Sequence, residues 1–341
     1  MNRAASSDHI STAHTGMAQA PIDAANSAGR SCPLRYRYGA AAIASAPLCE
    51  ASILYVIGGL YGNLPALDAI EAMARAESGP VTLCFNGDFN WFNVDASSFA
   101  AINQRVLQHH AIVGNVEAEL LADSDEAGCG CAYPASVDNA VVERSNRIHA
   151  RLKATADTFP ALQAQLAGLP MFARFQVGSC RVGVVHGDAD ALAGWGFDAT
   201  ALEQAHKQAW LLDSLAHAQV DVFASTHTCQ PALKRVTQVS GPAAEAGASA
   251  GIIINNGAAG MPNFPAERGL FGLITRIAIS PSPHAPVYGA RQREVFVDAL
   301  PVHYAQQDWQ AQFLRNWPPG SDAWLSYFAR ISTGCGAAPR Q

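Results

Sequence analysis

Four polar side chains each follow a short apolar run in this chain of 341 residues: Asp88, Asn115, His186 and His227. One carboxylate, one amide and two imidazoles supply the oxygen and nitrogen ligands that suit Mn, Fe or Zn. An ion held by such ligands could activate a water molecule or orient a phosphate group. Taken singly, an aspartate after a strand is often a helix N-cap, and a histidine there is often a satisfied core residue. The four together indicate a site.

The apolar runs before these side chains are typical of buried strands in a parallel sheet. The run from Ile53 to Ile57 is followed by a turn at Gly62-Asn63 and a segment with helical spacing. Similar runs at 81–85 and 111–113 are separated by another helical segment. This alternation predicts an α/β fold with parallel strands and right-handed crossovers. Because ligands bind beyond the carboxyl ends of parallel strands, we expect the polar side chains to meet at that edge.

The rest of the chain divides into a terminal segment, further strands and two helical additions. Residues 1–48 are rich in Ala, Ser, Gly and His, and we expect most of them to be disordered, with the segment Leu34–Gly39 as a candidate to dock on the protein. Residues 49–300 are assigned to one domain with a helical insertion at about 118–172, and residues 301–341 to a helical C-terminal extension. Further strands are expected at 173–177 and 180–188, which form a hairpin, and at 220–226, 270–280 and 293–300.

The composition argues against several classes of partner. The formal net charge is −6 and the basic residues are scattered, so neither nucleic acid nor an anionic membrane is expected as a partner. No apolar stretch is long enough to span a bilayer, and we expect no secretory signal at the N-terminus. Eight cysteines in a chain of this length do not suggest a disulfide scaffold, so we expect reduced thiols in the cytoplasm.

Six short blocks, each placed after an expected strand, resemble those of the calcineurin-like metallophosphoesterase family. The family's blocks run D-x-H-G-N, G-D, G-N-H-[DE], H-G, G-H-x-H and an N-P-G-S-like loop. The matching segments are G-L-Y-G-N at 59–63, G-D at 87–88, G-N-V-E at 114–117, H-G at 186–187, S-T-H at 225–227 and N-N-G-A-A-G-M-P at 255–262. The resemblance implies a layered sheet sandwich flanked by helices, and a metal-dependent phosphoesterase that acts on a small phosphorylated substrate.

The resemblance also implies roles for the four polar residues. Asp88 corresponds to the carboxylate that bridges two metal ions in the family, and Asn115 and His186 correspond to ligands of one of those ions. His227 corresponds to a ligand of the other ion. The candidate catalytic residues are therefore Asp88, Asn115 and His186, and the candidate metal ligands are these three with His227.

Four departures from the family pattern fall at chemically important positions. The aspartate and histidine of the first block, which ligate one ion in the family, are Gly59 and Tyr61 here. The histidine of the G-N-H block is Val116, and the first histidine of the G-H-x-H block falls at Ser225. We therefore expect an incomplete centre, with one divalent ion (Mn, Fe or Zn) held by the carboxylate, the amide and the first imidazole.

Other side chains near these positions could replace the lost ligands. Asp188 and Asp190 follow the H-G block, Cys229 follows S-T-H, and C-G-C at 129–131 offers two thiols close together. A site rebuilt from cysteine and histidine would favour zinc. The ordinary interpretation of the C-G-C segment, a loop with two small polar residues, is preferred. Glu117 is expected to support the loop backbone rather than to bind metal.

Tyr61 and the turn that follows it are the candidate substrate-binding elements. The tyrosine either fills the volume left by the lost ligands or donates a hydrogen bond to a phosphoryl oxygen. The helix start at Asn63 could bind a phosphate through backbone N–H groups. Aromatic runs at 90–92, 193–197 and 261–264 lie on loops near the same edge. They serve either as packing beneath a cap or as a platform for a planar group such as a nucleobase.

Two functions are consistent with these observations. The first is hydrolysis of a phosphate mono- or diester at an altered, mononuclear centre, which the persistence of the four polar side chains indicates. The second is binding of a phosphorylated ligand or a partner protein without catalysis, which the four losses indicate. A subgroup with its own chemistry is a third interpretation, and the sequence alone does not separate it from the first.

Overall fold

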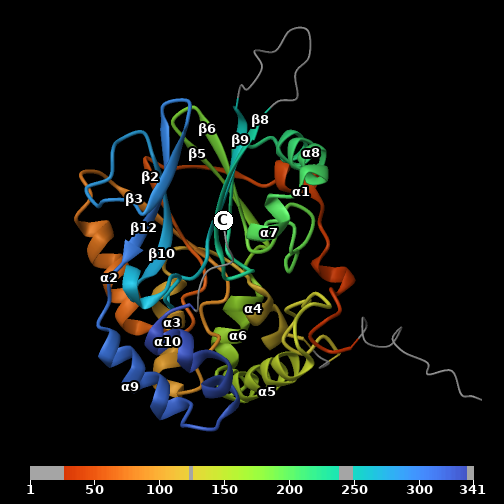
Figure 1. Ribbon diagram of the computed structural model, residues 1–341, viewed down its shortest axis with the longest axis vertical. Helices are drawn as coiled ribbons and strands as arrows, with labels where there is room; N and C mark the ends of the chain where they lie inside the picture. Colours follow the sequence, from red (N-terminus) through yellow and green to blue (C-terminus); the bar gives the residue numbers. More distant parts are fainter. Residues whose placement is uncertain (1–26, 123–125, 238–248, 336–341) are drawn as a thin grey trace, which may run out of the picture.

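The computed structural model describes residues 27–122, 126–237 and 249–335. Within these ranges the strands form two six-stranded sheets that pack face to face, with helices on their outer faces and at one end (Figure 1). The predicted α/β sandwich of layered sheets is therefore confirmed. None of the helices in the described ranges is both long enough and apolar enough to cross a membrane.

The first sheet is centred on β2 (Ile53–Ile57), whose five residues are all buried. The other strands of this sheet are β3 (Val81–Asn86), β4 (His110–Ile112), β10 (Gly272–Ala278), β11 (Tyr288–Gln292) and β12 (Val295–Val302). On one side β2 pairs in parallel with β3, and β3 pairs in parallel with β4, as predicted. On the other side β2 pairs antiparallel with β10, which is followed by β12 and β11.

The second sheet runs in the order β1-β5-β6-β7-β9-β8. Its strands are β1 (Leu48–Glu50), β5 (Phe172–Val177), β6 (Cys180–Val185), β7 (Val222–Ser225), β8 (Pro231–Thr237) and β9 (Ser249–Asn256). The predicted hairpin is the antiparallel pair β5–β6, and β6, β7 and β9 pair in parallel. Strands β1 and β8 were not predicted, because β1 is short and β8 is only partly buried, so neither shows a continuous apolar run.

The main core lies between the two sheets. Leu54 of β2 packs there with Val182 of β6 and Ile254 of β9, all fully buried. Ile57 of β2 faces the other way and packs against Leu67 of the helix that follows. Both faces of β2 are therefore covered, which explains why this strand reads as an unbroken apolar run.

Helices cover both outer faces and gather at one end of the sheets (Figure 1). The first sheet is covered by α2 (Leu64–Arg75), and the second by α1 (Ala40–Ala44) and α8 (Gln208–Ala218). At the end of the sheets lie α3 (Ala96–Val106), α4 (Asn115–Leu120), α5 (Asn139–Ala156), α6 (Pro160–Ala167), α9 (Gln306–Asn316), the π-helical turn η5 (Trp324–Phe328) and α10 (Ala329–Thr333). Shorter elements are η2 (Leu34–Tyr36), α7 (Ala199–Leu202), η3 (Ala205–Lys207) and η4 (Ala266–Arg268). The predicted helical insertion thus consists of α5 and α6, separated before Pro160 as expected from its sequence.

Part of the segment that we expected to be disordered packs on the protein. Residues 1–26 lie outside the described ranges, but residues 27–48 contain η2, α1 and the start of β1. Tyr36 is fully buried and its hydroxyl donates a hydrogen bond to the Glu119 carboxylate. The Gly29 N–H also donates to the Ala127 carbonyl, 2.8 Å away. The expected docking candidate Leu34–Gly39 is therefore part of a longer packed segment, which these contacts hold against the protein.

Candidate metal centre

The four predicted polar residues meet where the ends of the two sheets face each other. Asp88 follows β3 and Asn115 begins α4 after β4, while His186 follows β6 and His227 follows β7. All four are buried, with at most 7% of any one exposed. Ligand atoms of Asp88, His186 and His227 lie within 4.8 Å of one another, a group able to hold a metal ion.

The distances around His186 Nε2 match those between the ligands of one ion. This nitrogen lies 3.1 Å from Asn115 Oδ1, 3.2 Å from His227 Nδ1 and 3.4 Å from Asp88 Oδ1. Metal–ligand bonds of about 2.1 Å place neighbouring ligands about 3.4 Å apart in a tetrahedron and about 3.0 Å apart in an octahedron. His227 therefore lies with the other three donors, although its family counterpart serves a separate ion.

Hydrogen bonds on the outer side of the cluster determine which atoms face inward as acceptors. The outward contacts are His186 Nδ1 to the Asn86 carbonyl (2.8 Å), His227 Nε2 to the Cys131 carbonyl (3.0 Å) and Asn115 Nδ2 to the Cys129 carbonyl (2.8 Å). Because a carbonyl only accepts, each outward nitrogen carries a hydrogen. With neutral imidazoles, His186 Nε2, His227 Nδ1 and Asn115 Oδ1 then all point lone pairs toward the Asp88 carboxylate. Histidines that ligate metals are held in this way.

The electrostatics of the cluster favour a cation. Burial alone would raise the pKa of Asp88, but the two imidazoles and the Val116 N–H (3.1 Å) hold that pKa below its usual value. Burial lowers the pKa of His186, yet the Asp88 carboxylate outweighs this and raises the pKa overall. Burial and the neighbouring His186 lower the pKa of His227 to about 3, so His227 is neutral at physiological pH. Acceptors this close are mutually repulsive without positive charge between them, so the residues present fit a bound metal ion.

Glu117 supports the loop beneath the cluster, as its sequence position suggested. Its Oε2 accepts the N–H groups of Asp88 (2.8 Å) and Gly114 (3.1 Å), and its Oε1 accepts the N–H of Asn90 (3.2 Å). Asp88 has a left-handed backbone, with φ of 53°, which costs free energy that these hydrogen bonds offset. Burial raises the pKa of Glu117 to about 7, and the nearby Asp88 carboxylate adds to this.

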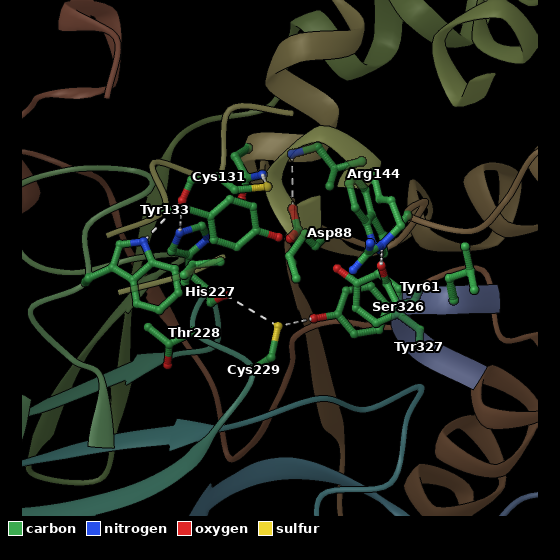
Figure 2. Close-up of a pocket in the computed structure, with 17 residues that line it drawn as sticks. Tyr61, Asp88, Cys131, Tyr133, Arg144, His227, Thr228, Cys229, Ser326 and Tyr327 are labelled. Carbon is green, nitrogen blue, oxygen red and sulfur yellow. Dashed lines mark hydrogen bonds between the residues drawn. The ribbon is translucent and has the colours of Figure 1, made fainter. Parts of the chain in front are cut away.

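Tyr61 occupies the side of the site where the family has its other ligands. A Cβ atom on Gly59 would lie 2.8 Å from the Cζ and Oη atoms of Tyr61, so the ring covers the space of a side chain at position 59. The Tyr61 hydroxyl lies 2.7 Å from Cys229 Sγ, as Figure 2 shows. The two replacements in the first block are therefore linked, because this position of the ring requires glycine at 59.

Asn63 does not reach the cavity at which the other candidates meet. Its side chain is fully buried, its Oδ1 accepts the Ala66 N–H (2.9 Å) and its Nδ2 donates to the Gly260 carbonyl (2.9 Å). The residue therefore caps α2, and the N–H group that we expected to be available for a phosphate is already bonded.

The suggested replacement ligands are engaged elsewhere. The Asp188 carboxylate accepts three N–H groups of its own loop, and Asp190 accepts the Trp210 Nε1–H at 2.9 Å. Cys129 and Cys131 are buried and contact the cluster mainly through their carbonyl oxygens, as the loop interpretation of C-G-C implies. Ser225 is buried and its hydroxyl has no hydrogen-bond partner among the described residues.

A cavity of about 350 Å³ opens above the cluster (Figure 2). Trp91 and Trp195, from two of the predicted aromatic runs, line it. Phe92 packs instead among the C-terminal helices, and Phe264 packs on Phe271. Sequence reasoning missed the contributions of α5 and η5, namely Val141, Arg144, Leu325, Ser326 and Tyr327. No local signal marks these residues, because only the packing of the insertion against the C-terminal helices brings them to the cavity.

Comparisons with known proteins identify the fold. No family model matches the sequence, and no curated protein matches it. Among solved structures, a metallophosphoesterase from Sphaerobacter thermophilus is similar at 16% identity, over 83% of this chain and 100% of that one, with a TM-score of 0.51. Hypothetical protein PH1004 from Pyrococcus horikoshii OT3 is similar at 14% identity, over 84% of this chain and 99% of that one, also with a TM-score of 0.51. The chain therefore has the metallophosphoesterase fold, and the resemblance seen in its motifs is confirmed at that level.

Proposed function

We propose that this protein is a metal-dependent phosphoesterase with a single-ion centre, which hydrolyses a phosphate mono- or diester. The observation that carries the proposal is the convergence of four acceptor atoms, from Asp88, Asn115, His186 and His227, within the spacing of one coordination sphere. Nitrogen and oxygen donors of this kind suit Mn, Fe or Zn. The cysteine content of the sequence favours a cytoplasmic location.

The chain's own residues would prepare the centre for hydrolysis. The carbonyls of Asn86 and Cys131 hold the two imidazoles with their lone pairs inward, and Asp88 supplies the compensating negative charge. The ion, when bound, supplies a Lewis acid and a water molecule with a lowered pKa. In the net reaction the water oxygen bonds to phosphorus, the ester P–O bond breaks, and the leaving alcohol takes up a proton. The Tyr61 hydroxyl lines the cavity, where it can donate to a phosphoryl oxygen.

One structural observation favours the second candidate, a relative that binds a phosphorylated ligand or a partner protein without catalysis. The ring of Tyr61 covers Gly59 on the side where the family holds another ion, so charge neutralisation is weaker than in a two-ion centre. The two functions differ in whether metal binding is accompanied by turnover.

The test is metal analysis and a phosphoester panel with matched aspartate variants. Asp88 and Asp188 are equally exposed (7%) and both follow strands, but only Asp88 belongs to the cluster. We expect the wild type to bind one Mn, Fe or Zn ion and to turn over a phosphoester, and Asp88→Asn to lose both properties. Asp188→Asn should retain the ion. Metal binding without turnover would favour the ligand-binding protein, and a wild type that binds no ion would refute the centre.

A further inference from the structure

We infer that the substrate of this centre is a small monophosphate ester of an aromatic alcohol or phenol, with Arg144 holding the phosphate. The inference rests on the proposed function and names its substrate class. It is carried by the cavity above the cluster, whose walls come from the helical insertion and the C-terminal helices.

The cavity has aromatic walls, and the hydroxyl-bearing side chains of Thr228 and Ser326 and several tyrosines lie among its lining residues. Tyr133 and Trp195 form one aromatic pair, with ring centroids 6.1 Å apart, and Trp195 also packs edge-on against His227 at 5.5 Å. Trp91 and Tyr327 form a second pair, at 6.4 Å and an angle of 85°. Flat apolar surfaces of this kind stack well on an aromatic ring. A sugar ring has no flat apolar face of this kind, so it would gain less from stacking on these walls.

Arg144 is the only lysine or arginine among the described residues that line the cavity. Its Nε donates to Ser326 Oγ at 2.7 Å, which ties α5 to η5 and orients the guanidinium (Figure 2). No residue in the described ranges accepts a hydrogen bond from its two Nη groups. A guanidinium positioned in this way presents a planar pair of donors, and such pairs bind phosphate oxygens in a bidentate fashion.

The charges around the cavity match a single phosphate group. Among the charged residues that line the cavity, Arg144 would bring one positive charge and the Asp88 carboxylate one negative charge, and a bound divalent ion would add two positive charges. The remaining two positive charges balance the dianion of a phosphate monoester. A diester would leave one charge unmatched, and a triphosphate would bring excess negative charge into a partly apolar cavity. The volume of about 350 Å³ also limits the ligand to a small molecule.

The first experiment ranks substrates and tests Arg144 against a matched arginine. Arg147 lies one turn further along α5, is largely exposed and pairs with Asp322 at 2.7 Å outside the cavity. We expect phenyl and 2-naphthyl phosphate to have a higher kcat/KM than ribose 5-phosphate or ATP. We expect Arg144→Gln to raise KM about 10- to 100-fold with a smaller change in kcat, because a charge-assisted bidentate contact is lost. Arg144→Lys should recover little, and Arg147→Gln should leave KM unchanged.

The second experiment measures binding of phenylphosphonate by calorimetry, which needs no turnover. We expect binding to the wild type and to Arg147→Gln, and a loss of about 10-fold or more in Arg144→Gln. If the wild type binds metal and is active but prefers ribose 5-phosphate or ATP, this inference fails and the proposed function stands. If turnover is absent but phenylphosphonate binding depends on Arg144, the hydrolase fails and the ligand class stands. If Arg144→Gln behaves like Arg147→Gln in both assays, the assignment of Arg144 is overturned. If Arg144→Gln does not fold, the wild-type substrate ranking decides the outcome.

Discussion

The two sides of the site differ in how much of the family's ligand pattern they keep. On the His186 side, four donors keep the distances of a coordination sphere. Outer hydrogen bonds of the two imidazoles and the amide hold their lone pairs inward. On the Tyr61 side, the positions of two family ligands hold a glycine and an aromatic ring that covers it. Both sides lie at strand ends of the same sandwich, so the fold itself does not explain the difference.

The comparison agrees with the proposed single-ion centre. The glycine at position 59 provides the space that the Tyr61 ring fills. On the other side, His227 Nδ1 lies 3.2 Å from His186 Nε2, within the spacing of one coordination sphere.

The largest effect is expected from a change in the metal ligands on the His186 side of the site. We expect His227→Ala to weaken metal binding about 100-fold or more, since changes outside the ligands themselves already cost 10- to 100-fold. A 100-fold loss corresponds to about 2.7 kcal/mol. Metal titration with a competing chelator would measure it, and phosphoesterase activity at limiting metal should fall in parallel.

The control for this prediction is Cys229→Ala, on the Tyr61 side of the site. Cys229 lines the same cavity two residues further along, and its thiol contacts the Tyr61 hydroxyl (2.7 Å) and the His227 carbonyl (3.4 Å) but none of the proposed ligand atoms. We expect its metal stoichiometry and affinity to match the wild type. Equal losses in the two variants would mean that the ion is shared between both sides, which would contradict a single-ion centre on the His186 side.

How much of this site could be predicted depended on where each residue lies relative to a strand. Asp88, Asn115, His186 and His227 follow buried strands whose apolar runs are visible in the sequence, so their meeting was predictable. The inward orientation of the His227 ring could not be predicted, because it depends on a hydrogen bond to the Cys131 carbonyl, 96 positions away in the chain.

Tertiary packing decided the remaining differences between expectation and structure. Asn63 has the sequence context of a phosphate-binding turn, yet its own side chain caps α2. Arg144 and Ser326 belong to helices whose positions are determined by each other, 182 residues apart, and no periodicity reports that contact. The aromatic segment Leu34–Gly39 marked a docking candidate within a polar region, but the partner of Tyr36, Glu119, lies 83 positions away and could not be read from the sequence.

A smaller effect is expected from a double-mutant cycle on the Tyr61 side of the site. Gly59→Ala should destabilise the protein by about 2 kcal/mol, because the residue has φ of 64° and the added Cβ meets the Tyr61 ring. In a Tyr61→Ala background the clash disappears, so the cost should fall to about 1 kcal/mol for the backbone alone. Chemical denaturation of the four proteins gives the coupling, expected at about 1 kcal/mol.

Gly39 provides the matched control for that cycle. It also has a positive φ, 73°, but an added Cβ would meet no atom within 4 Å. Gly39→Ala should therefore have only a backbone cost, of about 1–3 kcal/mol, and the same cost whether or not Tyr61 is present. If the loss of stability on Gly59→Ala is also the same with and without Tyr61, the two first-block replacements are independent.

The smallest expected effect separates the two interpretations of Tyr61. Tyr61→Phe keeps the ring over Gly59 and removes only the hydroxyl, which contacts Cys229 at 2.7 Å and lines the cavity. If that hydroxyl donates to a phosphoryl oxygen, KM should rise about 5-fold, because a net hydrogen bond is worth about 1 kcal/mol. Metal stoichiometry and kcat should change little, since the donors on the His186 side are unchanged. An unchanged KM with a lower Tm would instead show that the tyrosine only fills space. The Tyr61 side of the site would then contribute to stability alone.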